Sequence, residues 1–156
     1  MAQVIPIAVA TDVHGARRAA KAMALAMGFD AKASEEITLV ISELASNLIR
    51  HARGGTLTLT PVNDSERVGI QLESCDRGPG LADAEQAITD GFSTGGSLGY
   101  GLGTVNRLMD HVDITSQHGA NARPTIVCTR WLRVDMSPQL PSARWSLAPP
   151  PAPIRR

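Results

Sequence analysis

Apolar positions between residues 34 and 52 recur at helical spacing and predict the best-defined element of the chain. They follow the i, i+3, i+4, i+7 pattern of a helix with one buried face: Ile37, Val40, Ile41, Leu44 and Leu48. Ser34 precedes the pattern as an expected N-cap, and Gly54-Gly55 follows it as an expected stop. The pattern therefore predicts an amphipathic helix over residues 34–52.

The rest of the chain alternates apolar runs with turn signals. Strands are predicted at residues 3–10, 56–61, 67–75, 111–118 and 125–134. Further helices are predicted at residues 13–27, 82–89 and 101–109. Asp12 is expected to cap the first helix, Gly28 to end it, and Pro6 to place the first strand at a sheet edge. These elements predict an α+β two-layer sandwich, with helices on one face of a mixed, mostly antiparallel sheet.

The length, charge balance and cysteine content exclude some classes of protein but indicate no particular function. The chain has 156 residues, which suits one domain, and its 15 Lys and Arg balance 15 Asp and Glu. A net charge of zero disfavours broad electrostatic binding to nucleic acid or to an anionic membrane. No signal peptide or long apolar run is evident, and Cys75 and Cys128 form no disulfide or metal pattern, so a cytoplasmic location is expected.

A change in composition marks the end of the predicted domain. Residues 1–136 carry the periodic segments, whereas residues 137–156 are rich in proline. Proline at this density is incompatible with a helix or a central strand. We therefore expect residues 137–156 to form a flexible tail that is partly polyproline II.

Three polar residues share one strip of the helix predicted at residues 34–52. Glu43, Asn47 and His51 are spaced i, i+4, i+8, at the border of the apolar face. A carboxylate and an amide oxygen one turn apart can hold a hydrated cation and orient a nucleophile. A solvated helix flank is the alternative.

The segment VGIQLESCDRGPGL combines a strand with a turn. Val68, Ile70, Leu72 and Ser74 alternate with polar neighbours, so Asp76 continues the inward-facing set. An inward carboxylate is costly unless it is bonded to donors. Asp76 could close a turn with the N–H groups of Gly78 or Gly80, or it could accept from a ligand donor such as an exocyclic amine. Gly78 and Gly80 would let a flat base approach the backbone.

Five glycines lie among the nine residues from Gly95 to Gly103, just before a predicted helix. Bare N–H groups at a helix start favour an anion such as phosphate. The run is not a P-loop, because no Gly-Lys-Ser/Thr follows, and Gly99, Gly101 and Gly103 do not have Rossmann spacing. Gly95 and Gly96 suggest a mobile lid. A surface loop without a ligand is the alternative.

Taken together, these motifs resemble those of a known superfamily. The order is E-x-x-x-N on a helix, D-x-G-x-G after a strand, and G-x-G opening a helix. It resembles the GHKL ATPases of gyrase, histidine kinases and MutL, and more closely their small serine/threonine kinases that act as anti-sigma factors or switch kinases. ISELASNLIRHARGG, DRGPGL, DGFSTGGSLGYGLGTVNRLMD and TRWLR look most like the stressosome switch kinases of the RsbT type. The resemblance spans about residues 5–133 and implies the GHKL (Bergerat) fold.

The resemblance also implies roles for individual residues. Glu43 would be the catalytic base, and Asn47 would bind Mg²⁺ beside the nucleotide, with His51 on the same strip. Asp76 would accept from the adenine amino group. The remaining candidates for ATP binding border the base, enclose the phosphates or support the adenine end: Gly78, Gly80, Ser93, Thr94, Gly95, Gly96, Ser97, Leu98, Gly99, Gly101 and Thr125. ARPT stands where the family has Gly-x-Gly-Thr before that threonine.

The implied reaction is transfer of the γ-phosphoryl group of Mg·ATP to a serine or threonine of a partner protein. The implied acceptor is a STAS-domain antagonist or scaffold protein, and phosphorylation would free the kinase for a PP2C-type phosphatase or a sigma factor. The resemblance is compatible with a homodimer. The alternative is a nucleotide-loaded binding module, such as an anti-sigma factor, that does not act as a catalyst. A histidine kinase is disfavoured, because His14 lies on a single helix without a dimerisation partner helix.

Overall fold

A computed structural model describes residues 1–76, 101–115 and 125–133. The helices are α1 (Ala10–Met27), α2 (Ala31–His51) and α4 (Leu102–Leu108). The strands are β1 (Gln3–Ile7), β2 (Gly55–Asn63), β3 (Val68–Asp76), β4 (His111–Thr115) and β5 (Thr125–Trp131). The helix predicted at residues 82–89, the glycine run before Gly101 and the proline-rich tail lie outside the described residues.

The described strands form one sheet in the order β1-β2-β3-β5-β4. Each pairing among them is antiparallel, so the mixed sheet expected from the sequence is antiparallel in this part of the chain. Pro6 lies on edge strand β1, as predicted, where its missing N–H removes no bond from the sheet interior. The last of the described strands, β5, lies between β3 and β4.

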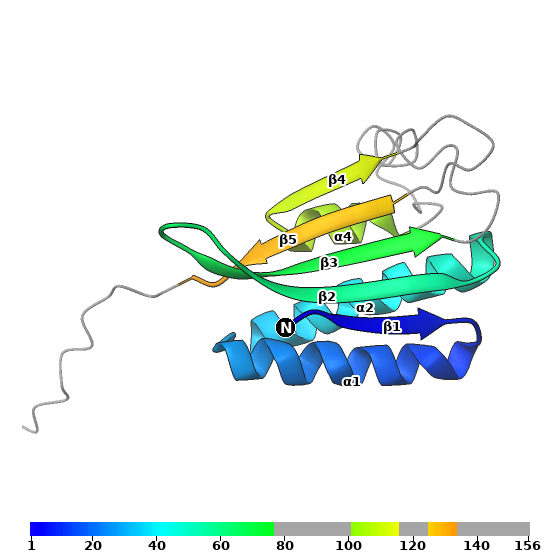
Figure 1. The fold of residues 1–156 in the computed structure, drawn as a ribbon, viewed down its shortest axis with the longest axis horizontal. Coiled ribbons are helices and arrows are strands. Elements are labelled where there is room, and N and C mark those ends of the chain that lie inside the picture. Colours follow the sequence, from blue (N-terminus) through cyan, green and yellow to red (C-terminus); the bar gives the residue numbers. More distant parts are fainter. Residues whose placement is uncertain (77–100, 116–124, 134–156) are drawn as a thin grey trace, which may run out of the picture.

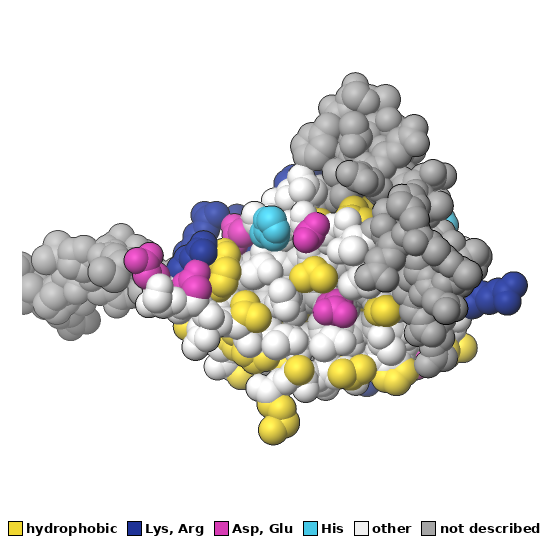
Figure 2. Space-filling model, turned by 45° about the horizontal axis from the view of Figure 1, so that its top comes forward, with side chains coloured by type: hydrophobic (Ala, Val, Ile, Leu, Met, Phe, Trp, Pro, Cys, Tyr) yellow, Lys and Arg dark blue, Asp and Glu magenta, His cyan; other side chains and the backbone are white. Residues whose placement is uncertain are grey.

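The sheet and the helices form two layers, and the described helices cover one face of the sheet (Figure 1). The core lies between the layers and is built from aliphatic side chains of α2 and of the inward positions of the strands: Ile37, Ile41, Leu44, Leu57, Leu59, Ile70, Leu72 and Ile126. On the other face, strand positions that alternate with the core residues carry threonine, such as Thr58 and Thr60. Figure 2 shows a mostly uncharged surface there, with scattered hydrophobic and acidic side chains, a histidine among them, and basic side chains toward one end. The expected two-layer architecture is therefore present.

The start of α1 differs from the prediction by a few residues. Asp12 was expected as the N-cap, but Val9 holds that position and Asp12 is the third residue of the helix. The carboxylate reaches back to accept from Ala8 N at 2.9 Å and from Val9 N at 3.0 Å. These two bonds end β1 early and lower the pKa of Asp12, because they favour its charged form. Gly28 ends α1 in the left-handed conformation, as predicted.

The start of α2 also precedes the predicted cap. The prediction of Ser34 as the N-cap is wrong, since Asp30 has the extended backbone of a cap and accepts from Ala33 N at 2.7 Å. Residues 31–33 read Ala-Lys-Ala and are good helix formers, so the helix extends by one turn before the amphipathic pattern begins. Ser34 is instead buried inside that first turn.

None of the described helices is long and apolar enough to cross a membrane.

Candidate active site

The C-terminal half of α2 carries the three polar residues that the sequence singled out. They lie on one helix, as their spacing predicted, but their exposure differs. Asn47 is buried with 6% exposure, Glu43 is half-buried, and His51 is exposed at the last residue of the helix. Asn47 and Glu43 therefore lie at the border between the core and the surface, where a ligand can reach groups that the fold holds still.

Asp76 is the last residue of β3 and points inward, as the alternation predicted. It is only 3% exposed, and its Oδ2 atom is sealed from solvent. Asp76 is in register with Gly55, where an added Cβ would overlap the carbonyl oxygen of Cys75 and lie 2.9 Å from a methyl carbon of Leu48. The bare backbone of Gly55 thus lets α2 approach the end of β3, and the two candidate segments meet there.

Thr125 opens β5 beside the end of β3. It is in register with Cys75, the residue before Asp76, and with Thr115 at the end of β4. The side chain is half-buried. Thr125 therefore lies beside the end of β3 that carries Asp76.

Gly101 brings α4 against α2. It is the N-cap of α4 with φ of 63°, in the left-handed region where side chains are disfavoured. A Cβ at this position would overlap Oε2 of Glu43, so the carboxylate lies directly against the Gly101 backbone. The two residues are far apart in sequence, and the tertiary fold makes them neighbours.

The structure therefore brings Glu43, Asn47, Asp76, Gly101 and Thr125 to one end of the sheet, with His51 at the rim. This end is formed by the last turns of α2, the end of β3, and the first residues of α4 and β5 (Figure 1). The other candidates lie outside the described residues: Gly78, Gly80, Ser93, Thr94, Gly95, Gly96, Ser97, Leu98 and Gly99.

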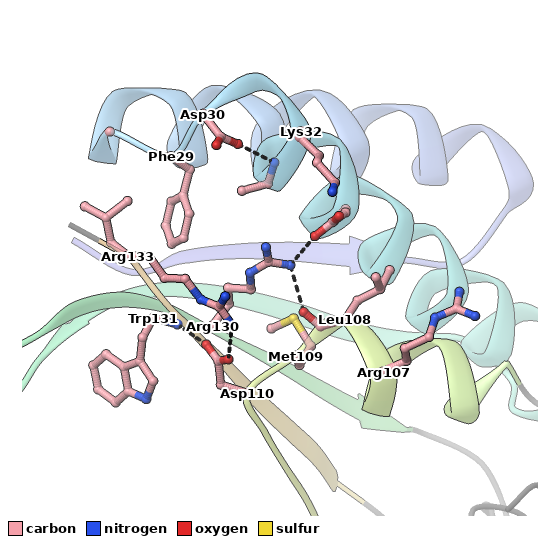
Figure 3. A pocket seen from close by; sticks show the side chains of 14 residues that line it. Phe29, Asp30, Lys32, Arg107, Leu108, Met109, Asp110, Arg130, Trp131 and Arg133 are labelled. Carbon is pink, nitrogen blue, oxygen red and sulfur yellow. Dashed lines mark hydrogen bonds and ion pairs between the residues drawn. The ribbon is translucent and has the colours of Figure 1, made fainter. Parts of the chain in front are cut away.

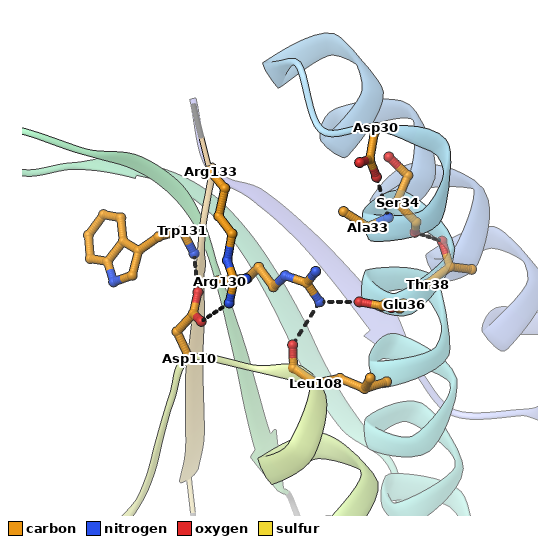
Figure 4. A network of polar contacts seen from close by, with 10 residues as sticks. All are labelled: Asp30, Ala33, Ser34, Glu36, Thr38, Leu108, Asp110, Arg130, Trp131 and Arg133. Carbon is orange, nitrogen blue, oxygen red and sulfur yellow. Dashed lines mark hydrogen bonds and ion pairs between the residues drawn. The ribbon is translucent and has the colours of Figure 1, made fainter. Parts of the chain in front are cut away.

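A polar network that the sequence analysis missed lies two turns before Glu43, near the start of α2. Arg130 on β5 donates from Nη1 to Oε2 of Glu36 at 2.6 Å and to the carbonyl oxygen of Leu108 at 2.8 Å (Figure 4). The arginine and glutamate side chains are 18% and 24% exposed. The sequence signals this network only through the segment TRWLR, which contains Arg130 but does not indicate which residues it contacts.

The same network borders a groove at the end of the sheet opposite Asp76. The groove encloses about 610 Å³ and lies between the start of α2, the end of α4 and the end of β5 (Figure 3). Asp110 closes one side, since it accepts from Trp131 N at 2.7 Å. Phe29 and Met109 contribute buried apolar side chains to this region. This groove is therefore separate from the nucleotide-binding candidates that the structure describes.

The described residues contain no group of three or more His, Cys, Asp or Glu side chains placed to hold a metal ion. A Mg²⁺ ion that accompanies a nucleotide needs only one or two protein oxygens, because phosphates and waters supply the rest. Asn47 and Glu43 offer such oxygens one helical turn apart.

The family follows from sequence comparison. Residues 7–131 match the family model described as the histidine kinase-like ATPase domain. The chain belongs to this family of ATPase domains, whose members bind ATP. Within it, the chain is a serine/threonine kinase similar to RsbT: it is 37% identical over 122 residues to the serine/threonine-protein kinase RsbT of Bacillus subtilis, covering 78% of this chain and 90% of that protein.

A solved structure shows the same fold. A chain of the SiaB–SiaC complex from Pseudomonas aeruginosa superimposes with a TM-score of 0.56 at 12% identity, over 85% of this chain and 89% of that chain. At this identity the likeness shows the fold alone. The family match and the structural likeness agree with the two-layer sandwich and the GHKL fold that the motifs implied.

Proposed function

We propose that this kinase transfers the γ-phosphoryl group of ATP to a serine or threonine hydroxyl of a STAS-domain partner in a bacterial partner-switching pathway. The observation that supports this most strongly is the position of Glu43, whose carboxylate lies against Gly101 at the end of the sheet where Asn47 and Asp76 also lie. The similarity to the kinase RsbT supports the reaction type.

The nucleotide is held in this proposal by two kinds of contact. The buried Asp76 accepts from the adenine amino group, and Thr125 on the neighbouring strand supports that end of the base. Gly78 and Gly80 border the base, while the residues from Ser93 to Gly99, together with Gly101, enclose the phosphates. Guanine presents an acceptor oxygen where adenine presents the amine, so Asp76 selects ATP over GTP.

The chemical step is an in-line displacement at the γ-phosphorus. The acceptor hydroxyl oxygen forms a bond to this phosphorus while the bond to the oxygen that bridges the β- and γ-phosphates breaks, and ADP leaves with the electron pair. Glu43 takes the proton of the acceptor hydroxyl. Most of the rate enhancement in such transfers comes from positioning and charge stabilisation, which suits a carboxylate fixed between two helices.

The donor set near Glu43 fits Mg²⁺, which prefers oxygen ligands. Asn47 would hold the ion through its amide oxygen, beside Glu43 on the same strip. When bound, the ion neutralises charge on the phosphates. Asn47 is buried, so the surrounding packing limits the motion of its side chain.

Replacing Glu43 by Gln tests the proposal directly. The variant keeps the shape of the side chain but removes the base, and general-base help is typically worth about 10²–10⁴ in rate. The proton leaves late in a loose transition state, so a loss near 10² is expected in single-turnover transfer of labelled phosphate to the partner. ATP affinity, measured on the same preparation, should change little. Glu73→Gln is the matched control, because this residue alternates with the inward positions of β3.

Two results would count against the proposal. Transfer at the wild-type rate in Glu43→Gln would remove Glu43 as the base. A wild-type protein that binds ATP and the partner tightly but transfers no phosphate would indicate a nucleotide-loaded binding module instead of a kinase.

A further inference from the structure

The short helix α4 contacts α2 at two points with matching spacing. Gly101, at its start, lies against Glu43, and Leu108, its last residue, accepts from Arg130, which also binds Glu36. Seven residues separate Glu36 from Glu43, and seven separate Gly101 from Leu108. Seven residues of helix span about 10 Å. The two helices therefore run antiparallel over the same two turns and are tied together at both ends.

The hydrogen bonds of Arg130 to Leu108 and Glu36, called the tie below, matter because α4 is too short to be stable alone. It has seven residues, and isolated helices of this length are not stable in water. Its last carbonyl groups also lack partners within the helix. Arg130 supplies one such partner, and its charge is favourable at a helix C-terminus. Leu102 and Val105 are buried and pack α4 onto the core, but apolar packing leaves sliding along the axis less restricted than a hydrogen bond does.

We propose that Arg130, oriented by Glu36, is a positioning residue for phosphoryl transfer: it fixes α4 along its axis and thereby holds the Gly101 backbone against the Glu43 carboxylate. Figure 4 shows the guanidinium between the Glu36 side chain and the end of α4. A shift of α4 would change the space available to the carboxylate, because Gly101 and Glu43 are in close contact. The inference rests on the proposed role of Glu43 as the base.

An arginine suits this role better than a lysine. Its guanidinium presents several N–H donors in a fixed plane, so one group can satisfy a carboxylate and a carbonyl at once. The side chain of Arg130 is 18% exposed and is thus shielded from most competing water. Arg130→Lys keeps the charge but loses the planar geometry, which makes it an informative intermediate variant.

The experiment compares Arg130→Gln, Arg130→Lys and Glu36→Gln with wild-type protein. We expect single-turnover transfer to fall about 10- to 100-fold in Arg130→Gln and less in the other two, since a small misplacement of a catalytic group is costly. ATP affinity should fall less than the transfer rate, because Arg130 and Glu36 do not contact the nucleotide in the proposed site and the contacts of Asp76 and Thr125 with the base remain. Amide hydrogen exchange in residues 102–109 should become faster in the order of the transfer defects.

Arg67→Gln is the matched control. This arginine pairs with Asp64 and lies over the Trp131 ring at 4.1 Å, so it borders β5 without a contact to α4. Its transfer rate and its α4 exchange should equal those of the wild type. A loss of transfer in this control as large as that in Arg130→Gln would overturn the inference.

Other results would also overturn it. Unchanged exchange across α4 in Arg130→Gln would show that the tie does not hold the helix. Faster amide exchange in α4 of Arg130→Gln, together with a wild-type transfer rate, would show that the position of α4 does not affect catalysis by Glu43. If Arg130→Gln does not fold, Glu36→Gln gives the same two measurements, with the same meaning. Failure of the proposed function is distinguishable, because it would appear as absent transfer in the wild type.

Discussion

At position 101, two features disfavour any residue other than glycine: the backbone conformation and the neighbouring carboxylate. The φ of 63° disfavours any Cβ, and a Cβ would also overlap Oε2 of Glu43. The first restriction acts through the local backbone, whereas the second depends on the fold. A double-mutant cycle can separate the two terms.

Gly101→Ala should lower the free energy of unfolding by roughly 1–2 kcal/mol because of the left-handed backbone, and displacing the end of the Glu43 side chain should add a smaller cost. In a Glu43→Ala background the overlap disappears, and the cost should fall toward about 1 kcal/mol. Urea unfolding of the four proteins measures the difference. An equal cost in both backgrounds would show that Glu43 contributes nothing to the cost of a side chain at position 101.

In the proposed site, nucleotide selectivity depends on Asp76. A hydrogen bond to a charged group is worth about 1.5–3 kcal/mol, so Asp76→Asn should weaken ATP binding roughly 10- to 100-fold. GTP should bind weakly to the wild type and change little in the variant. Calorimetry with both nucleotides measures this, and Asp113→Asn, an exposed carboxylate on β4, is the control. Equal affinity of the wild type for ATP and GTP would contradict the assignment.

At the scale of elements, α2 connects the two ends of the molecule. Its first turns carry the Asp30 cap and Glu36, and its last turns carry Glu43, Asn47 and His51. The helix therefore positions both the catalytic candidates and the tie to α4. Its N-terminal boundary is set by Asp30 and not by Ser34.

The boundary of α2 can be tested by comparing two substitutions. Asp30→Ala removes the carboxylate that accepts from Ala33 N and should cost about 1 kcal/mol of stability, as loss of an N-cap typically does. Ser34→Ala should cost less, because the Ser34 hydroxyl makes only a long contact of 3.5 Å with the carbonyl oxygen of Phe29. Thermal or urea unfolding measures both. A larger cost for Ser34→Ala would favour a helix that begins one turn later.

At the scale of the whole molecule, the two cysteines differ in exposure, so their reactivity can distinguish the native protein from the unfolded one. Cys128 is fully buried on β5, between β3 and β4, and burial raises the pKa of its thiol to about 12. Cys75 on β3 is partly exposed. Since the thiolate is the reactive form, Cys128 is doubly protected, by lack of access and by its protonation.

A thiol reagent at pH 8 should therefore modify Cys75 in the native protein and leave Cys128 unmodified. Cys128 should react only as the domain unfolds, at a rate that rises with urea together with the loss of circular dichroism. Cys75→Ser isolates the signal of Cys128. Rapid modification of Cys128 in the native state would mean that β5 is not held between β3 and β4.

The sequence by itself determined most of the elements and several site positions. Hydrophobic periodicity placed α2 and the described strands, because side-chain direction in a helix or strand is a local property of the backbone. For the same reason, the spacing put Glu43 and Asn47 on one strip, and alternation turned Asp76 inward. Helix boundaries were less accurate, since Asp12 and Asp30 act through caps whose register depends on a few competing hydrogen bonds.

Only the tertiary structure decided which of these residues meet. The contact of Gly101 with Glu43, the place of β5 between β3 and β4, and the bond between Arg130 and Glu36, which are 94 residues apart, follow from no local pattern. Such contacts arise when many side chains pack together at once, and their free energy is shared over the whole core. Local periodicity determines on which side of its helix or strand a residue lies, whereas packing determines which distant residue it contacts.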